Sequence, residues 1–83
     1  SGFSRAKKLS YQEMRELEAL PGKIDSLEQE QANITLRLNE PIIYRDYPDE
    51  ATALQARFAA IEKELIDCIA RWEELESKSA AKT

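Results

Sequence analysis

Residues 54–75 read LQARFAAIEKELIDCIARWEEL, and this stretch decides the fold of the chain. Its apolar side chains recur at intervals that alternate between four and three residues, the spacing of a helix packed lengthwise against another helix. We name them seam residues: Leu54, Phe58, Ile61, Leu65, Cys68, Trp72 and Leu75. The stretch therefore predicts a long amphipathic helix that requires a partner helix.

A second stretch with the same spacing lies earlier in the chain, and it supplies that partner. Its seam residues are Leu17, Leu20, Ile24, Leu27, Gln31, Ile34 and Leu38. When the two stretches are set antiparallel, the residue numbers of every facing pair sum to 92, from Leu17 with Leu75 to Leu38 with Leu54. This constant register predicts an all-α fold, an antiparallel two-helix coiled-coil hairpin formed within one chain. Gln31 is the one polar seam residue, and such a residue typically fixes register at some cost in stability.

The first helix has clear start, interruption and stop signals. Ser10 and Glu13 have the spacing of a capping box, so we expect the helix to begin there. Pro21 interrupts the backbone hydrogen bonds, but the seam keeps its spacing across it, which predicts a kink or a break near Pro21 within a helical region of about 10–38. Asn39, able to adopt a left-handed cap, and Pro41 mark the end of this region.

The connection between the helices is too apolar for a free loop. Residues 39–49 include Ile42, Ile43, Tyr44 and Tyr47, which we expect to cover the tip of the hairpin with one short helical turn over residues 41–44. Pro48 fits the first position of a second helix over 48–77. The predicted organisation is therefore a flexible basic linker end over 1–9, a hairpin over 10–77 and a disordered tail over 78–83.

Charged residues flank the seam, and the sequence leaves two pairings open. If each flanking residue contacts the flanking residue closest to it on the other helix, the pairs are mostly of like charge: Lys23 with Arg71, Glu30 with Glu64 and Arg37 with Arg57. We call this the closer stagger. A shift of seven residues along the partner makes every pair opposite: Glu16 with Arg71, Lys23 with Glu64, Glu30 with Arg57 and Arg37 with Glu50. Exposed ion pairs contribute little to stability, so we expect the apolar layers to set the register in either case.

Two apolar residues lie off the seam. Ile66 and Ile69 occupy one flank of the second helix, where a two-helix coil normally carries charges. We expect Tyr11, Met14, Pro21 or Leu9 to cover them. The alternative is that they are scattered surface hydrophobes, which are common on soluble proteins.

Composition excludes several classes of function. The 83 residues include no His, one Cys and two Gly, which leaves no disulfide framework, zinc site or glycine-rich phosphate loop. Cys68 on the seam is interpreted as a small buried hydrophobe. No apolar run approaches the roughly 20 residues of a membrane span and no secretory signal opens the chain, so we expect a cytoplasmic, non-enzymatic domain without membrane contact.

The net charge is −4, but the first nine residues carry three cations and no acid. In an antiparallel hairpin these lie near cations at the ends of both helices. The resulting candidate site for nucleic-acid phosphates comprises Arg5, Lys7, Lys8, Arg15, Arg71, Lys78 and Lys82. The alternative interpretation is a solvated linker and tail.

Two groups of motifs resemble a known family. K-L-S-Y at 8–11 is followed by R-E-L-E-A-L-P at 15–21, and R-W-E-E-L-E stands at 71–76. In this order they resemble the C-terminal domain of the ABC-F ATPases, most closely the Uup type. The resemblance implies a two-helix coiled coil that follows two tandem ATP-binding cassettes in a soluble protein. ATP and Mg²⁺ would belong to those cassettes, so no cofactor and no catalytic residue is carried over to this stretch.

The resemblance also implies function, since this family is associated with DNA binding and ribosome function. We therefore expect a monomeric, non-catalytic domain that binds DNA or RNA through backbone phosphates. The alternative is a protein-interaction or spacer hairpin that docks on the ATPase cassettes, the ribosome or a second copy.

Overall fold

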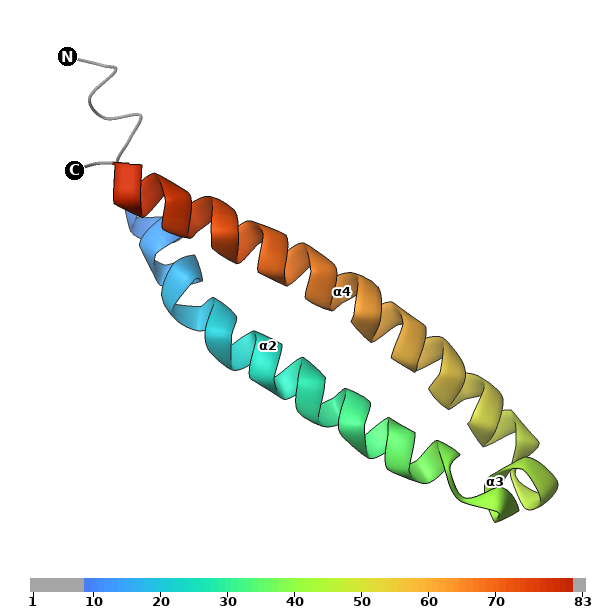
Figure 1. The fold of residues 1–83 in the computed structure, drawn as a ribbon. Helices are drawn as coiled ribbons and strands as arrows, with labels where there is room; N and C mark the ends of the chain where they lie inside the picture. Colours follow the sequence, from blue (N-terminus) through green and yellow to red (C-terminus); the bar gives the residue numbers. More distant parts are fainter. Residues whose placement is uncertain (1–8, 82–83) are drawn as a thin grey trace.

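The chain folds into an antiparallel helical hairpin (Figure 1). This computed structural model describes residues 9–81, with helices α2 (Tyr11–Leu38), α3 (Pro41–Asp46) and α4 (Pro48–Ala81). Helices α2 and α4 lie side by side and α3 closes the tip, giving a rod of 65 × 16 × 15 Å. We call the opposite end, where α2 begins and α4 finishes, the open end. The predicted all-α hairpin is confirmed.

Helix α2 begins at the predicted capping box. The Ser10 hydroxyl accepts a hydrogen bond from the Glu13 backbone N–H at 3.1 Å, and the Glu13 carboxylate accepts one from the Ser10 N–H at 2.9 Å. Two backbone donors of the first turn are thereby satisfied. At the other end Asn39 caps the helix as predicted; its φ of −84° is right-handed, so it does not use the left-handed conformation that asparagine can adopt. Its N–H still reaches the carbonyls of Thr35 and Leu36.

Pro21 lies inside α2, which continues through it as one helix of 28 residues. Proline has no N–H to donate and its ring crowds the preceding turn, so the helix bends in the blue part of its ribbon without ending (Figure 1). The structure therefore selects a kink over a break. The seam spacing explains this continuity, because seam residues on both sides of Pro21 pack against α4.

The hydrophobic core is the seam. Ile61 and Leu75 are fully buried, and Gln31 is half-buried. All thirteen apolar seam residues belong to one packed cluster, which also includes Leu9. Its buried members are Leu20, Ile24, Leu27, Ile34, Ile61, Cys68 and Leu75. The predicted core is thus the observed core.

The tip is closed by α3. Ile43 on this helix is fully buried and Ala51 of α4 nearly so, while the Tyr44 hydroxyl donates a 2.6 Å hydrogen bond to the Leu38 carbonyl. This bond satisfies an orphan carbonyl at the end of α2. Of the four apolar residues expected to cover the tip, Ile43 is buried, whereas Ile42, Tyr44 and Tyr47 remain largely exposed. Helix α3 extends to Asp46 and is longer than the single turn expected.

Helix α4 continues to Ala81, beyond the predicted end at 77. Residues 78–81 are therefore helical and do not belong to the predicted tail. The Lys78 ammonium bonds the Glu13 carboxylate at 2.6 Å, which ties this last turn to the start of α2. The predicted flexible linker end covered residues 1–9, but Leu9 packs against the core cluster and does not belong to a flexible linker. Residues 1–8 of that linker and the tail residues 82–83 lie outside the described residues.

Candidate nucleic-acid interface

One flank of the hairpin carries a row of ion pairs between α2 and α4. We call it the paired flank. The guanidinium of Arg71 contacts Glu16 at 2.7 and 2.9 Å, and that of Arg57 contacts Glu30 at the same two distances. Two further pairs complete the row: Arg37 with Glu50 at 2.9 Å, and Lys23 with Glu64 at 3.4 Å. These are the four opposite-charge pairs of the shifted stagger, so the structure settles the question that the sequence left open.

The row follows the antiparallel register of the two helices. Its members recur every seven residues, upward along α2 and downward along α4. Three of the pairs are bidentate, an arrangement in which both guanidinium N–H groups meet both carboxylate oxygens. Hydrogen bonds from Arg71, Arg57 and Arg37 lower the pKa values of the carboxyls they contact, those of Glu16, Glu30 and Glu50.

At the open end, two of the predicted phosphate-binding residues lie among carboxylates. Lys78 bonds Glu13, and Arg71 contacts Glu74 at 3.0 Å besides Glu16. The hydrogen bond from Lys78, followed by the Ser10 N–H, lowers the pKa of Glu13. The antiparallel fold thus brings Arg71 and Lys78 together as predicted. A phosphate would have to displace glutamates to reach either of them.

Arg15 has a different environment. Its guanidinium donates a 2.9 Å hydrogen bond to the Tyr11 hydroxyl and lies 5.8 Å from the centre of the Tyr11 ring. The side chain is exposed and makes no ion pair within residues 9–81. The remaining predicted site residues, Arg5, Lys7, Lys8 and Lys82, lie outside the described residues.

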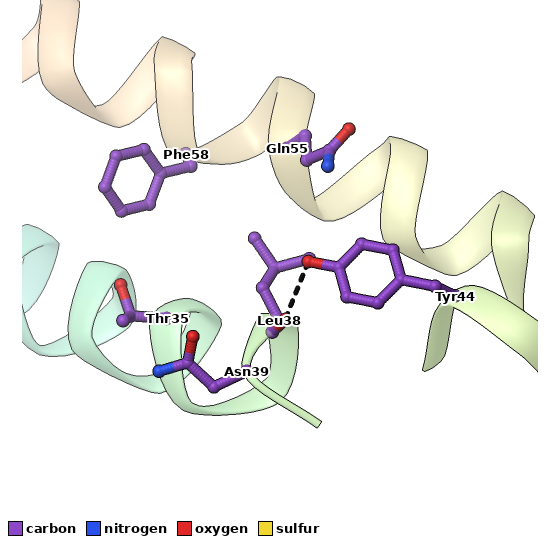
Figure 2. Close-up of a pocket in the computed structure, with 6 residues that line it drawn as sticks. All are labelled: Thr35, Leu38, Asn39, Tyr44, Gln55 and Phe58. Carbon is purple, nitrogen blue, oxygen red and sulfur yellow. Dashed lines mark hydrogen bonds between the residues drawn. The ribbon is translucent and has the colours of Figure 1, made fainter. Parts of the chain in front are cut away.

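The other flank of the hairpin, which we call the open flank, is hollowed in two places. The groove nearer the tip has a volume of about 400 Å³. Figure 2 shows Leu38 of α2 and Tyr44 of α3 on one side of it and Phe58 of α4 on the other. Thr35, Asn39 and Gln55 complete the lining. The sequence analysis did not predict this groove. Thr35 and Gln55 were a signal for it, because these two uncharged residues lie beside the seam and cannot form an ion pair between the helices.

The second groove lies nearer the open end and has a volume of about 440 Å³. Its lining residues are Ile24, Glu28, Ile69, Trp72, Glu73 and Glu76. Beside it Ile66 is 67% exposed and Ile69 is 40% exposed, and the expected cover is absent within the described residues, since Tyr11 is 70% exposed and Met14 47%. Leu9 packs against the core. Ile66 and Ile69 therefore form an uncovered apolar patch at the rim of this groove.

The described residues place two limits on chemistry. Over residues 9–81, no group of three or more His, Cys, Asp or Glu side chains is arranged to hold a metal ion. Cys68 is a free, buried thiol in the core. A search of the same stretch finds no helix with the length and apolar character of a bilayer span.

A fold of this kind, with one continuous seam, a row of ion pairs on one flank and grooves on the other, defines a helical-hairpin domain. Residues 8–77 match the ABC transporter C-terminal domain family, and the chain belongs to this family. Two Haemophilus influenzae proteins, "ATP-binding protein Uup-like" and "ATP-binding protein Uup", are each 38% identical to it over 71 residues, or 86% of this chain. The resemblance to Uup-type C-terminal domains is thereby confirmed.

The chain corresponds to a small part of these relatives. It spans 16% of the length of the first and 11% of the second. No solved structure matches the chain.

Proposed function

We propose that this chain is the non-catalytic, coiled-coil C-terminal hairpin of a cytoplasmic ABC-F ATPase, and that it binds the phosphate backbone of DNA or RNA at its open end. The family membership supports the place of the hairpin in such a protein. ATP and Mg²⁺ would be held by cassettes outside this sequence. The hairpin itself contributes a rigid rod and a charged end.

One observation narrows the phosphate site. Arg71 and Lys78 are bonded to glutamates, so their positive charge is balanced inside the hairpin. Residues 9–81 contain eight Lys and Arg and all sixteen Asp and Glu, a balance of −8 that repels phosphate along most of the rod. The proposed phosphate contacts are therefore Arg5, Lys7, Lys8 and Lys82. Arg15 joins them, because it is a described cation in the first turns of α2 that is not in an ion pair.

The test is binding of the 83-residue chain to a fluorescent DNA duplex, followed by anisotropy at several salt concentrations. About four phosphate contacts predict a slope of roughly −3 to −4 for log K against log salt. The double variant Lys7→Gln/Lys8→Gln should bind at least tenfold more weakly at low salt and show a shallower slope. Duplex RNA serves as the second ligand.

The matched control removes the same charge elsewhere. Arg45→Gln/Lys63→Gln changes two exposed cations away from the open end and should leave affinity within about twofold. Lys78→Gln should also have little effect on affinity, because this ammonium is already bonded to Glu13. Absence of binding at low salt, or equal loss from both double variants, would contradict the proposal.

A further inference from the structure

The two flanks of the hairpin differ in a way that points to a second contact surface. On the paired flank, ion pairs bridge α2 and α4 at every heptad from Glu16 to Arg37. The open flank has no such bridge among the described residues, and the two grooves of about 400 and 440 Å³ lie on it, whereas a smaller hollow of about 160 Å³ lies beside Glu16 and Lys23 of the paired flank. Thr35 is seven residues from Glu28 and Gln55 fourteen from Ile69, so the grooves occupy the same faces of their helices.

The groove nearer the open end combines an apolar floor with an acidic rim. Ile24 and Trp72 of the seam form part of its lining, and Ile69 and neighbouring Ile66 extend the apolar surface outward. The three carboxylates of the lining, Glu28, Glu73 and Glu76, take part in no ion pair within residues 9–81. Elsewhere along the rod, five glutamates are paired with cations of the partner helix.

These features specify the chemistry of an occupant. A volume of about 440 Å³ can receive an apolar side chain, and a groove between two helices can bind the apolar face of a third helix. Carboxylates around it favour cations on either side of that face. We propose that the open flank binds a basic amphipathic helix of a partner protein, with an apolar residue seated between Ile69 and Trp72 and cations against Glu28, Glu73 and Glu76. This inference is independent of the nucleic-acid proposal.

The charges disfavour the other occupants. In a symmetric dimer across this flank, the same three glutamates of both copies would meet, and like charges in an interface are destabilising. Phosphates are repelled by the same carboxylates. A cationic segment is the occupant that gains from them.

Trp72 provides the measurement, since it is the only tryptophan of the chain and lines the groove. The ligand to use is an 18-residue peptide of leucine and lysine with one apolar and one cationic helical face. Titration into the 83-residue chain should shift the Trp72 emission to shorter wavelength with a saturable isotherm. A peptide of the same design with glutamate in place of lysine should give no shift.

Matched variants locate the site. Glu28→Gln/Glu76→Gln should weaken binding at least tenfold, whereas Asp49→Asn/Asp67→Asn, which removes two carboxylates away from the groove, should change it less than twofold. Ile69→Ser should also abolish the shift, and circular dichroism should show an unchanged fold because Ile69 lies outside the core cluster. Equal effects of both double variants would overturn the proposal.

One further outcome would show that the groove binds a segment of this chain and not a partner protein. The first eight residues are basic and include Phe3. If Lys7→Gln/Lys8→Gln shifts Trp72 emission to longer wavelength without any peptide, the occupant is this segment, and the proposal of a partner protein is wrong. Unchanged emission of this variant, together with saturable peptide binding, supports it.

Discussion

Gly22 weakens α2 at the turn where Pro21 already removes a hydrogen bond. Its φ is not positive, so the backbone does not require glycine, and a Cβ built there has no atom within 4 Å. Glycine in a helix interior is less favourable than alanine because it loses more backbone freedom on folding. Gly22→Ala should therefore raise the free energy of unfolding by about 0.5–1 kcal/mol, measured by urea denaturation.

The matched variant is Ala19→Gly, on an exposed position of the preceding turn. It should lower the free energy of unfolding by a similar amount, with an unchanged denaturant slope. A lower urea midpoint for Gly22→Ala would show that this turn depends on the flexibility of glycine.

Single residues also show where sequence reasoning succeeded and failed. The capping role of Ser10 and the burial of Cys68 followed from position alone, because a local spacing or a seam position determines each. The environment of Arg71, in contrast, could not be predicted from its position in the sequence. Counting cations at the open end predicts Arg71 as a phosphate ligand, but it does not show that the carboxylates of Glu16 and Glu74 contact its guanidinium.

Between elements, the paired flank makes the stability of the hairpin sensitive to acid. The pKa values of Glu13, Glu16, Glu30 and Glu50 lie below their ordinary value of 4.5 in the folded chain, chiefly through hydrogen bonds from Lys78, Arg71, Arg57 and Arg37 in turn. A lowered pKa in the folded state stabilises it fully above the unfolded pKa, and this contribution is lost as pH falls through the folded pKa.

The expected result is a urea midpoint that is constant at neutral pH and decreases as pH falls below about 4.5, the ordinary carboxyl value. Glu30→Gln should lower the midpoint at pH 7 and make this decrease smaller, because the Arg57 pair is then absent. Glu18→Gln, which removes an exposed carboxylate that makes no ion pair among the described residues, should keep the full decrease. A Glu30→Gln profile identical to that of the original chain would contradict the role given to the row of ion pairs.

The lengths of the elements show what spacing encodes. Seam periodicity located both long helices, since burial of one face decides their extent. The sequence predicts the end of α4 at 77, because the residues that follow are mostly polar, whereas the helix continues to Ala81. These residues contain no Gly or Pro, Ala and Lys are good helix formers, and Lys78 bonds Glu13 across the open end. The choice between the two charge staggers depends on the reach of long side chains, which residue spacing does not encode.

For the whole molecule, the two flanks differ in their charges and grooves, a difference that the sequence did not show. The nucleic-acid site is predicted from the excess of cations at one end of the hairpin, and the sequence alone shows that excess. The grooves of the open flank arise where facing side chains fail to fill the space between α2 and α4, and this depends on their packing in three dimensions. Ile66 and Ile69 are the part of that surface that the sequence analysis identifies, and their exposure shows that residues 9–81 do not cover them.

The hairpin should be stable as a monomer, because both halves of its seam belong to one chain. Intramolecular pairing makes the melting temperature independent of protein concentration, whereas a stable folded dimer would melt at higher temperature as concentration rises. Thermal melts followed by circular dichroism over a hundredfold range of concentration should superimpose, and sedimentation should give the mass of one chain. Ile66→Ser should leave both results unchanged, since this exposed side chain lies outside the core cluster. A melting temperature that rises with concentration in the original chain, and ceases to do so in Ile66→Ser, would instead identify the open flank as a contact between two copies.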